Sequence, residues 1–502
     1  MQNGETRQPR LTGAKVFTAS FFIRHASFFL IALLALAIRL PELGQRPMHT
    51  DEAVNAYITG QLLAGQAYHY DPQDRHGPLL YLMAEPLARM LGAKQFSDLT
   101  ETQLRLTPVL AGCVTILLFG AGVELFGFTA CLMAALLFAF APLPLYYNRY
   151  FIHETLFVAA TWGLIICGWR AWQTNSLLAA ALTGGCAALM LAAKETAVIH
   201  FFAIAVAWLW TARTCPRLGT AQPIASSKGG NLSPHAKWLK AAATAGAVFV
   251  VVAILLFTWG GQNWSALAGL LHAIPNFTAR AGGEGHEKPF WYYTVLLAGG
   301  WSGAVLLFLG AAGIVLAFRR PRAAAAFALA VYALVVFAIY SAIPYKTPWL
   351  ALNFWLPLAL LAGLTVERIW FAQPKLPVRA GTLAALAMIG ILMAHDTRQW
   401  VFLKPADEKN PYAYAHTGED LLRLPGRLEQ LARQSKITDP RIAVVAADPW
   451  PLPWYLRKFS QVGYWQPGQA TGPADFFITS TDVSGPLTEQ LKHFRPEYFG
   501  WR

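Results

Sequence analysis

Two adjacent carboxylates, Asp51 and Glu52, lie in a polar stretch that follows the first long apolar run of the chain. A carboxylate beside a bilayer is well placed to take a proton from an acceptor hydroxyl, and positioned general bases typically accelerate such steps by roughly 10²- to 10⁴-fold. His49, two residues before Asp51, is a further candidate for this site. The other interpretation is a solvated loop in which Thr50, Asp51 and Glu52 cap a short helix beginning at Ala53.

A second cluster of charges, Asp74-Arg75-His76-Gly77-Pro78, lies further along the same polar stretch. Arg75 and His76 could hold an anion there, because a guanidinium matches phosphate oxygens with two hydrogen bonds. A pair of unit charges at about 4 Å is worth roughly 4 kcal/mol at an effective dielectric constant of about 20. The other interpretation is an ordinary turn at Gly77-Pro78, with Asp74 pairing with Arg75.

Charged residues also interrupt the apolar sequence between residues 130 and 171, where Arg149, His153 and Glu154 occur together. A charge at the bilayer centre costs roughly 2.5 to 3.5 kcal/mol on translocon scales, so such groups tend to face a protein interior or a cavity. These three side chains are therefore candidates for a site at the membrane surface. For Arg149 the alternative is that its side chain extends to the membrane interface.

Lys194 separates two further apolar runs, and Tyr345-Lys346 precedes another. All three residues are candidates for the same site. The alternative for Tyr345 and Lys346 is structural, since aromatic residues and lysines commonly anchor helix ends at the membrane interface. The loop 282–288 carries His286 and two glutamates that could bind a metal, but their spacing matches no specific metal site.

The elements that must position these residues are membrane-spanning helices. The chain has 502 residues, of which 55% are hydrophobic and only 13% are charged. This composition excludes a set of soluble domains, a disordered chain and a coiled coil. The apolar runs long enough to cross a bilayer number about eleven. They lie at about 21–40, 104–126, 130–147, 152–171, 177–193, 196–212, 238–259, 291–318, 323–343, 348–366 and 378–396.

The distribution of positive charge indicates how these helices are oriented. Lys and Arg number 40 against 27 Asp and Glu, which gives a net charge of +13. In a soluble chain this excess would suggest nucleic acid, but here it fits cytoplasmic loops, which are enriched in Lys and Arg. With residues 1–20 in the cytoplasm, alternate loops carry the basic stretches 213–240, 319–322 and 368–379. The sequence predicts a multi-pass protein of the cytoplasmic (inner) membrane that contacts membrane lipids and no nucleic acid.

The C-terminal region, residues 397–502, differs from the long apolar runs that precede it. Its hydrophobic runs are short and bounded by Pro, Gly and Asp, with strands expected at 441–446 and 474–479 and a helix at 418–434. An odd number of spans places this region outside the cytoplasm. The predicted parts are a cytoplasmic N-terminus (1–20), a transmembrane domain (21–396) whose outer loop 41–103 carries the carboxylates, and a small extracytoplasmic α/β domain (397–502).

The order of these motifs resembles that of the GT-C membrane glycosyltransferases, in particular protein O-mannosyltransferases and lipid A aminoarabinose transferases. The resemblance rests on residues 51–52, 77–81 and 148–150 and covers the chain to about residue 396. The tail segments 410–417 and 448–457 are similar to a subgroup of archaea and bacteria named flippase-activity-associated membrane proteins. The resemblance implies an all-α polytopic membrane fold of GT-C type with about eleven transmembrane helices, followed by the small α/β domain.

The resemblance also implies roles for individual residues. Asp51 matches the catalytic carboxylate that activates the acceptor, and Glu52 matches its acidic neighbour. The residues implied to bind the donor phosphate are Arg75, His76, Arg149 and Lys194. The remaining site candidates are His49, His153, Glu154, Tyr345 and Lys346. One departure is His76, which begins a His-Gly-Pro-Leu segment where the aminoarabinose branch has Lys-Pro-Pro-Leu. Histidine is mostly neutral at pH 7, so it does not replace the positive charge of that lysine.

The implied reaction is an inverting transfer of a sugar from a polyprenyl-phosphate donor to a hydroxyl of a glycan, lipid or protein acceptor on the outer membrane face. Asp51 would deprotonate the hydroxyl while Arg149, Arg75 or Lys194 stabilises the departing phosphate. Metal dependence stays open, because the family contains both kinds. The alternative is a non-catalytic accessory role in the translocation of lipid-linked sugars. Charges gathered at the outer ends of the spans favour surface chemistry over passage.

Overall fold

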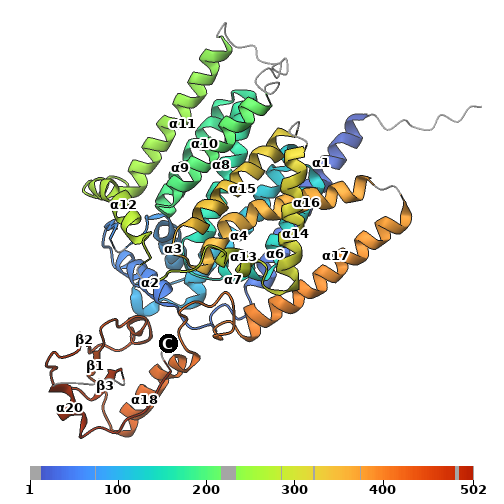
Figure 1. Ribbon diagram of the computed structural model, residues 1–502. Coiled ribbons are helices and arrows are strands. Elements are labelled where there is room, and N and C mark those ends of the chain that lie inside the picture. The colour runs from blue at the N-terminus through green and yellow to red at the C-terminus, as the bar shows by residue number, and fades with distance from the viewer. Residues whose placement is uncertain are drawn as a thin grey trace, which may run out of the picture.

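The computed structural model describes residues 13–73, 75–215, 233–283, 285–319, 323–372, 375–480 and 486–500. A body of long helices carries a small sheet domain at one end (Figure 1), which confirms the predicted combination of a polytopic helical protein with a small α/β domain. Parts of the predicted cytoplasmic segments, residues 1–12, 216–232, 320–322 and 373–374, lie outside the described residues, as does Asp74, the predicted partner of Arg75.

The helical body consists of apolar helices of membrane-spanning type. Within the described ranges, eight helices are long and apolar enough to cross a bilayer, and three shorter apolar helices accompany them. The eight are α4 (Glu101–Ala121), α8 (Glu154–Thr174), α10 (Ala197–Thr214), α11 (Pro234–Phe257), α14 (Gly300–Arg319), α15 (Ala324–Ala342), α16 (Leu352–Ala372) and α17 (Leu376–Thr397). The shorter ones lie in α1 (Gly13–Arg39), α6 (Phe128–Phe140) and α9 (Leu177–Ala193). Each predicted apolar run contains one of these helices.

One predicted run is divided. The run 291–318 contains a short helix α13 (Tyr292–Leu297) and then α14, which starts at Gly300 with φ +70°. A Cβ on Gly300 would lie 2.7 Å from Oδ2 of Asp396, so this left-handed turn also brings the chain close to the end of α17. A hydropathy profile does not reveal this turn, because the sequence is apolar on both sides of it.

Several connections contain short helices, and the three largest form an additional layer at one end of the body (Figure 1). The largest are α2 (Thr50–Leu63), α3 (Leu79–Met90) and α12 (Ala266–Arg280), which lie at the end nearest the sheet domain (Figure 1). The remaining short segments are η1 (Phe96–Asp98), α5 (Val123–Phe126), α7 (Pro142–Tyr147), η3 (Pro348–Ala351) and η4 (Arg398–Leu403). We call this end, with α2, α3 and α12, the loop-rich end.

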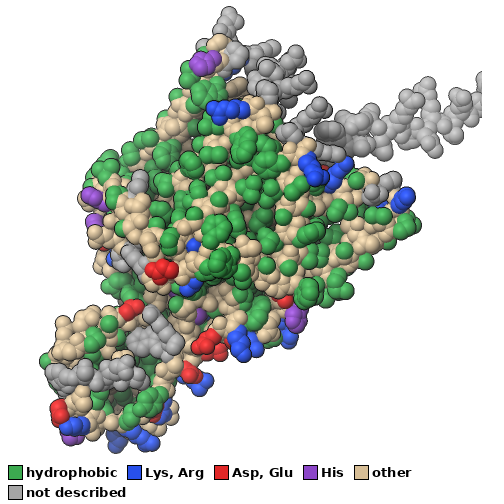
Figure 2. Space-filling view, in the orientation of Figure 1, with side chains coloured by type: hydrophobic (Ala, Val, Ile, Leu, Met, Phe, Trp, Pro, Cys, Tyr) green, Lys and Arg blue, Asp and Glu red, His purple; other side chains and the backbone are tan. Residues whose placement is uncertain are grey.

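The two ends of the body carry the loops that the positive-charge pattern assigns to opposite sides. The described start of α1, the end of α10 and the start of α11 lie at the end opposite the loop-rich end (Figure 1). Figure 2 shows hydrophobic side chains covering much of the helical body, with charged side chains mainly near its ends and on the small domain. This separation fits a multi-span membrane protein; which end faces the cytoplasm stays a prediction.

The small domain is a three-stranded parallel sheet with helices. Its strand order is β2-β1-β3, with β1 (Ile442–Val445) between β2 (Val462–Trp465) and β3 (Phe476–Thr479). All four residues of β1 are buried, as expected for a central strand. Its helical segments are η5 (Glu419–Arg423), α18 (Leu424–Gln434), α19 (Leu452–Tyr455) and α20 (Pro486–Leu491). The predicted strands and helix are present, whereas β2 was not predicted because its four residues include a glycine and give little periodicity.

The sheet domain is joined to the loop-rich end by a shared core and specific hydrogen bonds. Its residues Val444 and Trp454 belong to the same apolar cluster as residues of α2 and α3. The indole Nε1 of Trp454 donates to Glu101 Oε1 at 2.8 Å, and the hydroxyl of Thr417 donates to the carbonyl of Met48 at 2.7 Å. These contacts fix the domain over the start of α2.

Candidate functional site

A cavity of about 460 Å³ lies at the loop-rich end between α2, α12 and the first turns of α8 and α10. It brings together residues that are far apart in the sequence. Of the predicted site residues, those lining the cavity are Asp51, Arg75, His76, His153, Glu154, Lys194 and Tyr345. The lining also includes apolar side chains, among them those of Ile199, Phe277 and Ile343.

Asp51 is positioned by the start of α2. The capping interpretation predicts a helix starting at Ala53, but helix α2 begins at Thr50 and its N-cap is His49. The ring Nδ1 of His49 accepts a hydrogen bond from the backbone N–H of Asp51 at 3.0 Å, so Nε2 carries the proton and donates to the Tyr414 carbonyl at 3.1 Å. Burial lowers the pKa of His49, which favours this neutral form. The side chain of Asp51 is exposed on the cavity side.

Glu52 points the other way and is completely buried. Arg105 donates from Nε and Nη2 to its two oxygens at 2.8 Å each, and Arg46 lies 3.5 Å away. The backbone N–H of Phe151 donates to Glu52 at 2.8 Å. Burial alone would raise the pKa of Glu52, but the charges of Arg105 and Arg46 and these hydrogen bonds lower it to about 2. Glu52 therefore holds α2, α4 and the turn before α8 together as a permanent anion.

The turn carrying Arg75 and His76 lies against the end of α9. His76 Nδ1 lies 2.7 Å from Glu195 Oε2, and the hydroxyl of Tyr70 donates to the other Glu195 oxygen at 2.9 Å. Burial opposes ionisation of Glu195, but the His76 charge and these hydrogen bonds give a net lowering of its pKa. Gly77 follows, and a Cβ there would lie 2.3 Å from the carbonyl oxygen of Ala192. Only glycine permits this approach, which sets the position of the whole turn.

Lys194 and Glu154 form a buried ion pair across the cavity wall. The neighbouring His153 is 3% exposed, and its Nε2 has no hydrogen-bond partner. Its ring lies 5.2 Å from the ring of His76. Burial, with the nearby charges of His76 and Lys194, lowers the pKa of His153 well below its usual value, so this ring is neutral and can accept a hydrogen bond.

Four predicted site residues do not line the cavity: His49 and Glu52, described above, and Arg149 and Lys346. Arg149 donates from Nη2 to the Pro41 carbonyl at 2.7 Å and lines a separate polar cavity. Lys346 is 1% exposed, and its Nζ donates to the carbonyls of Lys288, at 3.1 Å, and Ile343. Burial lowers the pKa of Lys346. This lysine therefore ties the 285–288 loop to the end of α15.

Other cavity residues were not singled out as site residues from the sequence. Asn55 accepts a hydrogen bond from Tyr81 at 2.8 Å and donates to the Phe151 carbonyl at 3.1 Å. Asp448 and Trp450 reach the cavity from the sheet domain. The signal that could have found this pair was their place in the 448–457 segment that carries the subgroup resemblance.

Within the described ranges, no group of three or more His, Cys, Asp or Glu side chains could hold a metal ion. His286, in the loop considered for metal binding, instead shares a hydrogen bond of 2.7 Å with the hydroxyl of Tyr414. Glu284 of that loop lies outside the described residues.

Comparison with known proteins places this geometry in a known fold. Residues 78–225 match the family model of dolichyl-phosphate-mannose-protein mannosyltransferases. No curated protein sequence matches the chain. The structure is similar to the crystal structure of ArnT from Cupriavidus metallidurans bound to undecaprenyl phosphate, with 15% identity and a TM-score of 0.64 over 94% of this chain and 96% of that chain. The chain has the GT-C fold.

A second GT-C structure agrees. The oligosaccharyltransferase of Archaeoglobus fulgidus, tethered with an acceptor peptide, is 14% identical, with a TM-score of 0.57 over 88% of this chain and 63% of that chain. At these identities the likeness concerns the GT-C fold, and the residues of this chain must carry the argument about its chemistry.

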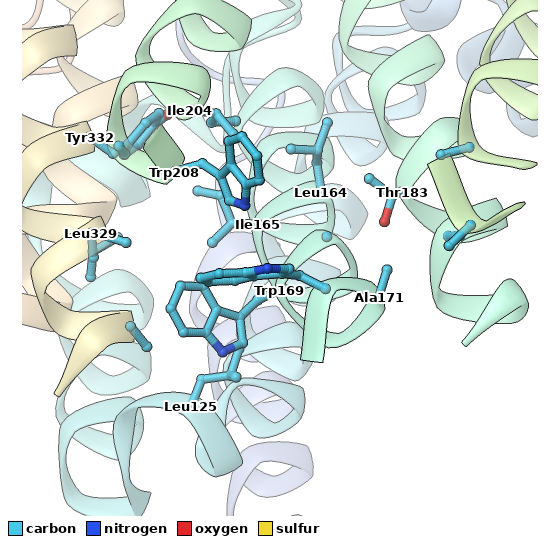
Figure 3. Close-up of a pocket in the computed structure, with 18 of the residues that line it drawn as sticks. Leu125, Leu164, Ile165, Trp169, Ala171, Thr183, Ile204, Trp208, Leu329 and Tyr332 are labelled. Carbon is cyan, nitrogen blue, oxygen red and sulfur yellow. The ribbon is translucent and has the colours of Figure 1, made fainter. Parts of the chain in front are cut away.

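The GT-C body also contains an apolar cavity of about 350 Å³ between α8, α10, α11 and α15. Figure 3 shows Trp169, Trp208 and Leu329 around it. None of the described residues that line it is charged. The described lining of this apolar cavity therefore offers no charged group for proton transfer or phosphate binding, whereas that of the Asp51 cavity does.

The Asp51 cavity of this GT-C chain combines three kinds of surface. Carboxylates of Asp51 and Asp448 supply potential bases, while Arg75 and Lys194 supply cations. The apolar side chains of the lining suit a hydrocarbon chain. Such a cavity can hold a lipid phosphate ester beside a group able to accept a proton.

Proposed function

We propose that this protein is an inverting membrane glycosyltransferase that moves a sugar from a polyprenyl-phosphate donor to an acceptor hydroxyl. The observation that carries the proposal is the meeting of Asp51 with Arg75, His76 and Lys194 in one cavity. These residues come from three separate segments, and each chemical role of such a transfer has a group available.

Asp51 is the proposed base. Its side chain is exposed to the cavity, and no ion pair within the described residues occupies its carboxylate. In the transfer, the acceptor oxygen forms a bond to the anomeric carbon as the bond from that carbon to the phosphate oxygen breaks. The hydroxyl proton passes to Asp51 and the lipid phosphate departs. A single displacement of this kind inverts the anomeric configuration.

Arg75, His76 and Lys194 are the proposed partners of the departing phosphate. Lys194 is paired with Glu154 in this structure, so the phosphate would share the lysine with that carboxylate. A unit charge pair at about 4 Å contributes roughly 4 kcal/mol at an effective dielectric constant of about 20, and a cavity from which water is excluded strengthens it. Glu52 has no direct part in this proposal, because it is buried in its ion pair with Arg105.

The lipid nature of the donor is supported by the apolar side chains in the cavity lining. Ile199, Phe277 and Ile343 line the cavity beside the polar groups. The similar ArnT structure holds undecaprenyl phosphate, a lipid of the proposed chemical class. With the predicted orientation, the cavity opens on the outer face of the cytoplasmic membrane, where a glycan, lipid or protein acceptor would approach beneath the sheet domain.

The test is transfer of radiolabelled sugar from a polyprenyl-phosphate donor pool in membranes, comparing wild type with Asp51→Asn at matched expression. Asparagine keeps the shape and removes the base, so transfer is expected to fall roughly 10²- to 10⁴-fold. Asp420→Asn is the matched control, because Asp420 is an exposed carboxylate outside the cavity, paired only with Arg423 on the surface. Its transfer should equal that of wild type.

Two results would refute the proposal. The first is an Asp51→Asn variant as active as wild type. The second is a wild type that transfers nothing across a broad set of polyprenyl-phosphate sugars. Either outcome would favour the accessory role in translocation of lipid-linked sugars.

A further inference from the structure

A second polar cavity, of about 500 Å³, lies on the other side of the start of α2. Asp51 faces the first cavity, whereas Arg105 and Arg46, the partners of Glu52, line the second. The beginning of α2 therefore separates two polar spaces, and the second has no part in the transfer proposed above.

A buried cation lies in the wall of this second cavity. Arg149 is 6% exposed, donates from Nη2 to the Pro41 carbonyl, and lies with its guanidinium 4.6 Å from the centre of the Phe402 ring. Its Nη1 is buried without a hydrogen-bond partner. No described carboxylate forms an ion pair with Arg149 within 4.0 Å. Glu52 pairs instead with Arg46 and Arg105. Burial and these two arginine charges lower the pKa of Arg149 to about 9. An oxyanion would supply the missing partner.

Two carboxylates line the same cavity. Glu42 and Glu419 are exposed, and neither forms an ion pair with Arg149 within 4.0 Å, although the charge of Glu42 partly offsets the lowering of the Arg149 pKa. A ligand carrying only negative charge would be repelled by them. A ligand that carries a phosphate and, a few ångströms away, an ammonium group would satisfy Arg149 and the glutamates together.

The cavity lies where a membrane presents such groups. It follows directly after α1, which ends at Arg39, and includes residues 401–403, at the end of the candidate membrane span Leu376–Leu403. Leu403 and Leu422, which also line it, are 52% and 41% exposed. Helix α17 lies at the edge of the body (Figure 1), and only 6% of its most apolar window is buried by protein, so lipid can reach this place.

We propose that this second cavity binds the headgroup of a phospholipid that carries both a phosphate and a primary ammonium group, as in phosphatidylethanolamine. Arg149 binds the phosphate with its free Nη1 donor, and Glu42 and Glu419 accept hydrogen bonds from the ammonium group. A primary ammonium has three N–H donors for these carboxylates, whereas a quaternary choline has none. The exposed leucines contact the glycerol and the start of the acyl chains.

The test is native mass spectrometry of the purified full-length protein in detergent, mixed in turn with phosphatidylethanolamine, phosphatidylglycerol, phosphatidylcholine and inorganic phosphate. The wild type is expected to retain phosphatidylethanolamine at least about tenfold more strongly than the other two lipids, and inorganic phosphate at the same concentration should not displace it. Arg149→Gln should reduce this retention at least about tenfold. Lys404→Gln should behave as wild type, because Lys404 is an exposed neighbouring cation outside the cavity lining.

Two surface variants test the same proposal if Arg149→Gln does not fold. Glu42→Gln and Glu419→Gln change exposed side chains, and together they should remove the preference for phosphatidylethanolamine over phosphatidylglycerol. Equal binding of the two lipids by wild type, displacement by inorganic phosphate, or unchanged retention by folded Arg149→Gln would each overturn the proposal. The assay contains no sugar donor, so its failure is distinguishable from failure of the glycosyl transfer.

Discussion

Replacing Glu52 by glutamine is expected to destabilise the protein by about 3 to 5 kcal/mol, because it leaves Arg105 as an unpaired cation in the interior. Glu52 is fully buried and receives hydrogen bonds from Arg105 and from the backbone of Phe151. The lowered pKa of Glu52, caused by the same contacts, gives a similar free energy. The fall from 4.5 to about 2 corresponds to about 3 kcal/mol in favour of the ionised folded form.

The same pKa shift predicts how this stabilisation depends on pH. Because the folded pKa of Glu52 lies below the unfolded value of 4.5, its contribution is fully present above that pH. It is lost as the pH falls from 4.5 towards about 2, where the folded carboxyl takes up its proton. The Glu52→Gln variant lacks this group and should lack its share of the acid sensitivity.

The assay is unfolding of the detergent-purified protein by a denaturant titration, followed by tryptophan fluorescence. Asp51→Asn is the matched control at the adjacent residue, because Asp51 is exposed in the cavity, and its unfolding free energy should stay within about 0.5 kcal/mol of wild type. The double variant Glu52→Gln/Arg105→Gln should lose less stability than the sum of the two single variants, since Arg105 is then no longer buried as an unpaired cation.

The reasoning is refuted if Glu52→Gln unfolds at the same free energy as wild type and loses only sugar transfer. Glu52 would then act in the chemistry, and the assignment of the two neighbouring carboxylates to different tasks would be wrong.

Further predictions concern the other groups that shape the cavity. Lys194→Gln leaves Glu154 buried without its partner and should destabilise the protein by about 3 to 5 kcal/mol. The double variant Lys194→Gln/Glu154→Gln should recover much of this stability. In steady-state transfer kinetics, however, its KM for the polyprenyl-phosphate donor should stay above that of wild type. Unchanged donor KM in the double variant would remove Lys194 from the phosphate site. Gly77→Ala places a Cβ 2.3 Å from the Ala192 carbonyl oxygen and should cost about 1 to 3 kcal/mol and reduce transfer. Gly390→Ala, in α17 with no atom within 4 Å of the added Cβ, is the control, and equal stability of the two variants would contradict the close approach.

Much of the membrane architecture could be predicted because the signals are local. A stretch of about 20 apolar residues has few stable alternatives to a helix when it lies in a bilayer, so composition alone locates α4, α8 and α15. The same reasoning singles out Lys194 and Glu154, since charged groups at the ends of apolar runs need partners. It does not reveal that these two residues, 40 positions apart, satisfy each other.

The roles of the site residues depend on directions that no local pattern contains. Asp51 and Glu52 are neighbours on α2, and consecutive helical side chains diverge by about 100°. The tertiary contact between Glu52 of α2 and Arg105 of α4 therefore decides which carboxylate is buried, while Asp51 faces the cavity. The helix start shows the same dependence, because the ring of His49 is held as N-cap by the distant Tyr414 carbonyl.

The sequence by itself determined a polytopic helical protein, a small α/β domain and a set of polar residues interrupting apolar runs, because hydrophobicity and charge are properties of short segments. Only the tertiary structure decided which of those residues share a space. It brings Asp448 of the sheet domain to the cavity of Asp51 and places Arg149 in a separate one. Both placements depend on contacts between segments that are distant in the chain. These contacts form, and stabilise the protein, only when the helices and the sheet domain pack together.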